Sequence, residues 1–474
     1  MNLIPSLVCA ALGMITTLLL IPLIRRKTEQ GVFTARAFHH THQTPISRLG
    51  GVALAAAFAV VALTVFVWFP AEGERLYTRL VIVGSALAMF GLGFWDDLKP
   101  IGAKKKLLGQ ILISTAVCYF GVQIETFKNP VTGEIYQLGM WGSAITVLWL
   151  VAMTNVINLI DGIDGLAAGI GLMMMALLAY VGLVGQLRFP ILVAAGMFGA
   201  LLGFLRYNFP PAKIFMGDGG AYFVGFLIGL LTLVHSQKGT ILAALVAPLF
   251  ALALPIVDVS LAILRRGLKG LPIFRPDRKH LHHRLQQVGF SRTRTVLILY
   301  GISSIFLLMA FGVFWSQGKW VPILFGFGCL VLILSARSFN FSRDWFAVGR
   351  VLENSQEVRK EAHYALAHAN WLELQAERAD SLEELWEDFL FAVRKMGFCA
   401  ATLETNFGNR EWRRPPEGAE WVSVHDLSLE GMTVLRLHGD SGSMSERVFE
   451  HISELAAEAW VKAATRWHKY HKQS

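Results

Sequence analysis

The stretch that decides the fold of this chain is MWGSAITVLWLVAMTNVINLIDGIDGL, residues 140–166. An apolar run of about 20 residues is long enough to cross a bilayer as one helix, and this one ends in Asn155, Asn158, Asp161 and Asp164. If the helix continues to Asp161, Asn158 and Asp161 share one of its edges. The glycines of the DGIDG sequence let the backbone turn tightly and approach a ligand. The stretch therefore predicts a membrane helix that carries polar groups to the edge of the bilayer.

The composition extends this interpretation to most of the chain. The 474 residues are 54% hydrophobic and 16% charged, with a mean hydropathy of +0.49, which excludes a water-soluble protein of this size. We expect an all-α polytopic membrane protein with about 11 transmembrane helices. The expected spans lie near residues 3–24, 49–69, 79–95, 107–122, 140–159, 166–185, 189–205, 219–234, 240–263, 296–315 and 320–336.

The basic residues indicate how the chain is oriented in the membrane. If the N-terminus lies outside, the inner loops carry roughly 20 Lys and Arg residues and the outer loops roughly 6, as the positive-inside rule predicts. The net charge of +9 is thus divided among short loops, so we predict no nucleic-acid partner. The first span lacks a preceding basic segment and is expected to stay uncleaved.

The charge of the sequence rises after about residue 340, which marks a change of domain. We place a membrane domain at 1–337, a helical linker at 338–380 and a soluble cytoplasmic α+β domain at 381–474. The last domain resembles a small GAF or PAS sensor. Its role, a regulatory partner for it and a homodimer of the chain are left open. Helices are expected at 348–378, 381–396 and 443–467, and strands at 400–405, 421–426 and 432–438.

A second polar string joins two adjacent carboxylates, Asp96 and Asp97, to Lys99 and the lysine run 104–106. Adjacent carboxylates repel each other and attract a divalent cation, and Mg²⁺ prefers one or two carboxylates plus substrate phosphates. The lysines would neutralise a diphosphate. The alternative is a basic loop that sets topology, beside a solvated acid pair.

Two further polar strings are predicted on the inner side. Asp218 stands just before a span, near an N-cap position, with glycines on both sides that would admit a metal or a phosphate; a plain helix cap is the alternative. His280, His282 and His283 lie among arginines and a lysine. These basic neighbours favour a phosphate over Zn²⁺ as the ligand of the histidines.

Taken in order, these strings resemble the polyprenyl-phosphate N-acetylhexosamine-1-phosphate transferase family over about residues 1–335. The matching parts are Asp96-Asp97 with its lysines and Gly109-Gln110, the NLIDGIDG string, Phe215 to Asp218 with Asn208 before it, and His280 to His283.

The resemblance implies a Mg²⁺-dependent enzyme, with Mn²⁺ as an alternative. In this reaction a lipid phosphate oxygen attacks the β-phosphorus of a UDP-sugar, and UMP leaves. The resemblance implies catalytic roles for Asp96, Asp97 and Asp218, of which Asp218 and Asp97 would bind the metal. Substrate contacts are implied for Lys104, Asn158, Asp161, Asp164, Asn208, His280, His282 and His283.

Within the family, the His-Leu-His-His-Arg string is similar to the N-acetylglucosamine branch. UDP-N-acetylglucosamine and undecaprenyl phosphate are therefore the expected substrates, in a pathway to an envelope polysaccharide such as O-antigen. Another UDP-HexNAc or UDP-MurNAc-pentapeptide is the alternative donor. The expected location is a bacterial inner membrane, with the active site and the C-terminal domain in the cytoplasm. Two interpretations of other classes stay open: a non-catalytic membrane scaffold, and an ion-coupled transporter, which would place its carboxylates at the bilayer centre.

Overall fold

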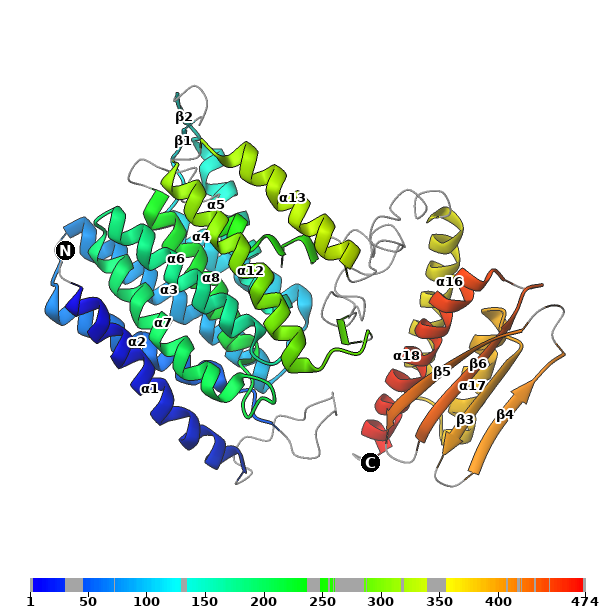
Figure 1. Cartoon of the computed structure of the whole chain (residues 1–474). Coiled ribbons are helices and arrows are strands. Elements are labelled where there is room, and N and C mark those ends of the chain that lie inside the picture. Colours follow the sequence, from blue (N-terminus) through cyan, green and yellow to red (C-terminus); the bar gives the residue numbers. More distant parts are fainter. Residues whose placement is uncertain are drawn as a thin grey trace. The chain divides into compact units, whose positions relative to one another are not determined.

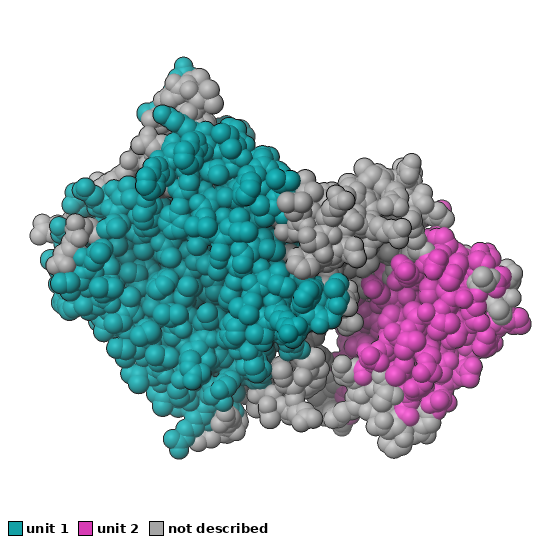
Figure 2. Space-filling model, viewed as in Figure 1, with its two compact units in different colours: residues 1–37, 42–261, 277–341 teal, residues 38–41, 262–276, 342–474 magenta. Residues whose placement is uncertain are grey.

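The chain divides into two compact units (Figure 2), which comprise residues 1–37, 42–261 and 277–341, and residues 38–41, 262–276 and 342–474. The fold is taken from a computed structural model. The structure describes residues 3–29, 46–71, 73–128, 134–236, 248–254, 256–258, 260, 285–286, 288–316, 319–338, 355–405, 408–415, 418, 420–429, 432–442 and 444–471.

The first unit is a bundle of helices (Figure 1). A short antiparallel hairpin of β1 (Thr126–Lys128) and β2 (Ile135–Gln137) interrupts the series of helices. The helices are α1 (Ile4–Glu29), α2 (Gly50–Trp68), α3 (Gly73–Leu98), α4 (Ala103–Tyr119), α5 (Met140–Ile160), α6 (Leu166–Val184), α7 (Arg188–Asn208), α8 (Gly217–Ser236), α12 (Arg292–Trp315) and α13 (Val321–Ser338).

Eight helices in the described part of the chain are long and apolar enough to cross a membrane: α1, α2, α3, α5, α6, α7, α8 and α12. The expected spans at 107–122 and 320–336 correspond to α4, which has 17 residues, and to α13, whose apolar stretch is short. The expected span at 240–263 lies about half outside the described residues. A multi-pass membrane protein is confirmed, whereas the count of about 11 spans stays a prediction.

Helix α8 lies at the centre of the bundle, and its sequence is apolar around most of its circumference. It packs against α2, α3, α5 and α6, and 83% of its span is buried, compared with 22% of the α1 span. Phe223 of α8 contacts Phe58 of α2, with 5.2 Å between the ring centroids. This packing brings the N-terminal residues of α8, Gly217 and Asp218, next to the ends of neighbouring helices.

Two glycines allow α2 and α3 to approach the first turn of α8. A Cβ atom on Gly93 of α3 would lie 2.4 Å from the carbonyl oxygen of Asp218, and one on Gly51 of α2 would lie 2.3 Å from the backbone nitrogen of Gly220. Real Cβ atoms do not approach a backbone this closely, so these positions require glycine. The three backbones therefore meet where α8 begins.

The second unit combines helices with one antiparallel sheet. Leu403, Leu435 and Leu437 point from the sheet into a core that also contains Phe389 and Trp460 of the helices. The strand order is β4-β3-β6-β5. The elements are α16 (Ser355–Gln375), α17 (Leu382–Lys395), β3 (Ala400–Thr405), β4 (Gly408–Arg413), β5 (Glu420–Leu429), β6 (Met432–Asp440) and α18 (Glu446–His471).

The strands predicted for the C-terminal region are confirmed, and they form a small antiparallel sheet. The expected strands at 400–405, 421–426 and 432–438 correspond to β3, β5 and β6, whereas β4 was not expected. Helix α17 begins after Ser381, whose hydroxyl accepts the backbone N–H of Glu384 at 3.2 Å, as an N-cap serine should. The domain bounds, the cytoplasmic location and the similarity to GAF or PAS domains stay predictions.

We predict that Gly93→Ala destabilises the first unit, because its new methyl group must displace the backbone of Asp218. The expected loss is about 1–3 kcal/mol, the usual cost of overpacking. Gly91→Ala is the matched control on the same helix, since a Cβ there meets no atom within 4 Å. The unfolding midpoint in detergent measures the effect, and equal midpoints for the two variants would contradict the close approach of α3 and α8.

Candidate active site

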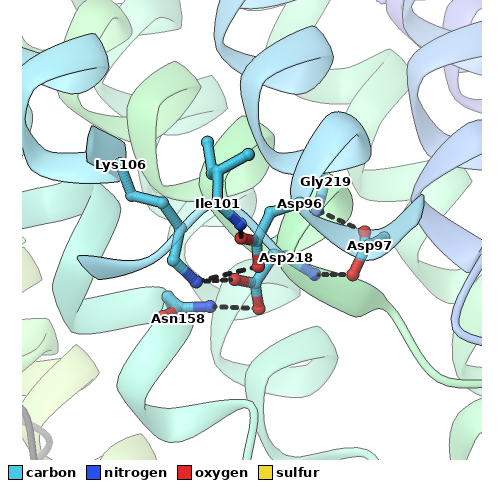
Figure 3. A network of polar contacts seen from close by, with 7 residues as sticks. All are labelled: Asp96, Asp97, Ile101, Lys106, Asn158, Asp218 and Gly219. Atoms are coloured by element: carbon cyan, nitrogen blue, oxygen red, sulfur yellow. Dashed lines mark hydrogen bonds and ion pairs between the residues drawn. The ribbon is translucent and has the colours of Figure 1, made fainter. Parts of the chain in front are cut away.

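Asp97 fixes the N-terminal end of α8. It lies in the last turn of α3, and its two carboxylate oxygens accept the backbone N–H groups of Asp218 at 2.9 Å and Gly219 at 2.8 Å (Figure 3). The first N–H groups of a helix have no partner within it, and a negative charge beside them is favourable. Gly217, with φ of +73°, turns the chain into the helix. Asp97 therefore holds Asp218 in position.

Lys106, in the first turn of α4, links two carboxylates from different helices (Figure 3). Its Nζ lies 2.9 Å from Oδ2 of Asp96 on α3 and 2.8 Å from Oδ2 of Asp218 on α8. The other oxygen of Asp96 accepts the backbone N–H of Ile101 at 2.9 Å. Burial disfavours the charge on Lys106, but the Asp218 and Asp96 carboxylates outweigh it and raise the pKa of this amine above its ordinary value. One ammonium group thus pairs with two carboxylates from different helices.

Asn158 joins this cluster from α5. Its Nδ2 donates to Oδ1 of Asp218 at 3.2 Å (Figure 3). One turn earlier on α5, Asn155 donates to Oε1 of Gln110 on α4 at 2.7 Å, and Gln110 is buried. This amide pair fixes the positions of the two helices because the buried Gln110 oxygen finds its partner on α5. The cluster therefore unites residues from α3, α4, α5 and α8.

Asp164 and Asn208 are both tied to the protein backbone. Oδ2 of Asp164 accepts the N–H of Ala212 at 3.0 Å. The Asn208 amide accepts the N–H of Gly165 at 3.0 Å and donates to the carbonyl oxygen of Ile214 at 2.8 Å. These bonds attach the loop after α5 to the segment between α7 and α8. Both residues thus support the backbone, and their contacts with a substrate stay a prediction.

Asp161 differs from the other acids of the site. Its carboxylate forms no hydrogen bond with the part of the chain that the structure describes, and its side chain is only partly accessible to solvent. Burial and the negative charges of Asp218 and Asp97 raise the pKa of the Asp161 carboxyl well above its ordinary value, although Arg48 opposes this shift. A carboxyl that is costly to ionise, beside an acidic cluster, is a candidate ligand-binding group.

The sequence did not single out Lys106. Lys104, which was expected to contact substrate, is exposed, and the ion pairs come from Lys106 instead; the role of Lys104 stays a prediction. A signal for Lys106 was present, because it and Gln110 are polar residues four positions apart on a mostly apolar helix and so share one face. The string His280 to His283 lies outside the described residues.

The acidic cluster offers the oxygen ligands that Mg²⁺ prefers. Oxygens of Asp96 and Asp218 converge on a single ammonium group, so the two side chains already share a point where a cation is held. Within the described ranges, no group of three His, Cys, Asp or Glu side chains is arranged to hold a metal. A Mg²⁺ ion at this cluster would therefore need additional oxygens from a bound phosphate or water, as it commonly does.

Known proteins match the helices that build this site. Residues 79–236 match the model of glycosyl transferase family 4. The chain is 35% identical over 311 residues to the "Probable undecaprenyl-phosphate N-acetylglucosaminyl 1-phosphate transferase" of Bacillus subtilis (strain 168), a match that covers 65% of this chain and 85% of that protein.

Two other relatives match a similar share of the chain. The decaprenyl-phosphate N-acetylglucosaminephosphotransferase of Mycobacterium tuberculosis (strain CDC 1551 / Oshkosh) is 34% identical over 287 residues, which cover 55% of this chain and 70% of that protein. The phospho-N-acetylmuramoyl-pentapeptide-transferase of Desulforudis audaxviator (strain MP104C) is 30% identical over 332 residues, which cover 65% of this chain and 97% of that protein.

The raised pKa of Asp161 leads to a prediction about stability. Because the folded state favours the protonated carboxyl, ionisation of Asp161 costs stability as pH rises above the pKa of the unfolded chain. Asp161→Asn should therefore raise the unfolding midpoint at pH 7.5, and the gain should shrink at pH 5.

Unfolding midpoints in detergent at the two pH values measure this difference. Asp164→Ala is the control, since loss of its bond to Ala212 should lower the midpoint at both pH values. A midpoint of Asp161→Asn below that of the wild type at pH 7.5 would show that the carboxylate is stabilised in the folded protein.

Proposed function

Because this chain belongs to the polyprenyl-phosphate N-acetylhexosamine-1-phosphate transferase family, we propose that it transfers N-acetylglucosamine-1-phosphate from UDP-N-acetylglucosamine to undecaprenyl phosphate. UMP is the second product, and the reaction begins the synthesis of an envelope polysaccharide at the cytoplasmic face of a bacterial inner membrane. The observation that carries this proposal is the cluster of Lys106, Asp96 and Asp218 at the ends of membrane helices. It brings together carboxylates, which can bind a metal ion, and an ammonium group, which can bind phosphate.

The reaction exchanges one phosphoanhydride bond for another. An oxygen of the lipid phosphate attacks the β-phosphorus of the UDP-sugar, and the bond from this phosphorus to the oxygen shared with the α-phosphorus breaks. That oxygen leaves with UMP. The chemistry depends mainly on positioning and on stabilising the charge that develops on phosphate oxygens.

The residues divide this work according to their contacts. Lys106 lies where it can neutralise the charge of the diphosphate, and Asp96 beside it can accept the proton of a monoprotonated lipid phosphate. Asp218 would hold Mg²⁺, which when bound would withdraw charge from the diphosphate. Asp97 positions Asp218 through the backbone of α8; if it also binds the metal, it does so with its remaining lone pairs. Asp161 and Asn158 are our candidates for contacts with the nucleotide.

The names of the relatives support this donor and acceptor. Two of them carry an N-acetylglucosamine phosphate transferase name with a polyprenyl phosphate acceptor, and the third is a phospho-N-acetylmuramoyl-pentapeptide-transferase. Higher identity to the first two favours UDP-N-acetylglucosamine as the donor.

We predict that the purified protein, supplied with Mg²⁺ and undecaprenyl phosphate, releases UMP from UDP-N-acetylglucosamine. The same assay should give less UMP from UDP-N-acetylgalactosamine and from UDP-MurNAc-pentapeptide. Chromatography of the nucleotide products measures the release, and reactions without the lipid are the control. If no donor yields UMP, the enzyme proposal is wrong; if only UDP-MurNAc-pentapeptide does, the assignment of the sugar is wrong.

Lys106→Gln should reduce kcat by about 100-fold or more, because the site loses the cation that faces the developing charge. Lys213→Gln is the matched control: this lysine is exposed and lies in another loop, between α7 and α8, so kcat should stay within about twofold of the wild type. Steady-state UMP release measures both variants. Similar rates for the two variants would mean that Lys106 serves only to hold α3, α4 and α8 together.

A further inference from the structure

Tyr300 of α12 reaches the start of α6 at the loop that carries Asp161. Its hydroxyl donates to the carbonyl oxygen of Gly165 at 2.5 Å. The ring fits beside Gly169 of α6, where an added Cβ atom would lie 2.1 Å from the hydroxyl oxygen. Because Gly169 has no side chain, α6 and α12 can pack with the Tyr300 ring between them, and its hydroxyl reaches the Gly165 carbonyl oxygen.

Gly165 is held on both sides of its backbone. Its N–H donates to Asn208 of α7, and its carbonyl oxygen accepts both the Tyr300 hydroxyl and the helical N–H of Gly169. Gly165 has φ of +80°, a conformation that side chains rarely permit. Three bonds from three directions thus determine the orientation of the loop that ends at this glycine.

This anchoring bears on Asp161, at the other end of the same short loop. The Asp161 carboxylate has no hydrogen-bond partner in the described part of the chain, so its place is set by the backbone that carries it. Asn208 anchors this backbone from the end of α7, and Ala212, in the segment between α7 and α8, anchors it through Asp164. Tyr300 anchors it to α12, which lies after the histidine string in the sequence.

We propose that Tyr300 is a positioning residue for the nucleotide end of the sugar donor, acting through Gly165 on Asp161. This inference rests on the proposed function, in which Asp161 contacts the nucleotide. Loss of the hydroxyl removes one bond to the loop while the ring keeps its place beside Gly169. The loop then samples more orientations, and binding of the donor must restore the productive one.

The test uses Tyr300→Phe in the full-length protein. We expect KM for UDP-N-acetylglucosamine to rise about tenfold, near the upper end of the effect of one hydrogen bond, with kcat within about twofold and KM for undecaprenyl phosphate unchanged. The unfolding midpoint should stay close to that of the wild type. Tyr180→Phe is the matched control, because Tyr180 lies at the same α6–α12 interface, with its ring 5.0 Å from that of Phe311.

A second variant tests the path of the effect. Gly169→Ala should raise the same KM, since its methyl group must push the Tyr300 ring away from Gly165. The double variant should then show a rise in KM close to that of either single variant, because both substitutions remove the same hydrogen bond between Tyr300 and Gly165.

Each outcome separates this inference from the proposed function. If the wild type releases no UMP from any donor, the proposed function fails and the inference fails with it. If the wild type is active and Tyr300→Phe leaves KM for the donor unchanged, the inference alone is overturned. A Tyr300→Phe protein that unfolds, or that loses kcat and midpoint together at constant KM, would show a structural role only and would also overturn it.

Discussion

The N-terminal end of α8 is the constraint on which the rest of the site depends. A helix that begins inside an apolar bundle exposes N–H groups that must find partners, and the Asp97 carboxylate accepts two of them. Because Asp97 lies at the end of α3, this bond also fixes α3 relative to α8. Gly93, one turn earlier on α3, lets the two backbones touch. Asp218 is thereby held where Lys106 of α4 and Asn158 of α5 can reach it.

Much of this arrangement could be predicted from the order of apolar and polar segments. The spans expected at 140–159 and 219–234 correspond to α5 and α8, because a helix satisfies its own backbone in lipid. Asp96, Asn158 and Asp218 were assigned to one site because each lies at a span end on the same predicted side. In the structure, Asn158 and Lys106 both contact Asp218, and Lys106 also contacts Asp96.

The choice among neighbouring residues could not be predicted in this way. Lys104 and Lys106 are two residues apart, which separates their side chains by about 200° around a helix. The order of segments does not distinguish them, and the packing of α4 against α3 and α5 turns the face that Lys106 shares with Gln110 toward the acids. Strand β4 was missed for a related reason. Its sequence, GNREWR, has no apolar alternation, and its register comes from pairing with β3, which local sequence does not encode.

Asp161 shows how the stability of this site is connected to its use. Asp97 accepts two backbone N–H groups, and Asp96 and Asp218 share the ammonium group of Lys106. Within the described residues, Asp161 has no such hydrogen-bond partner, and the anchored loop alone sets its position. Burial and the neighbouring acids therefore oppose its ionisation. Buried charged groups normally have partners, and proteins tend to depart from this rule where function requires it. A ligand that brings a hydrogen-bond donor or a positive charge to Asp161 would remove this cost, so its binding would stabilise the folded protein as well as occupy the site.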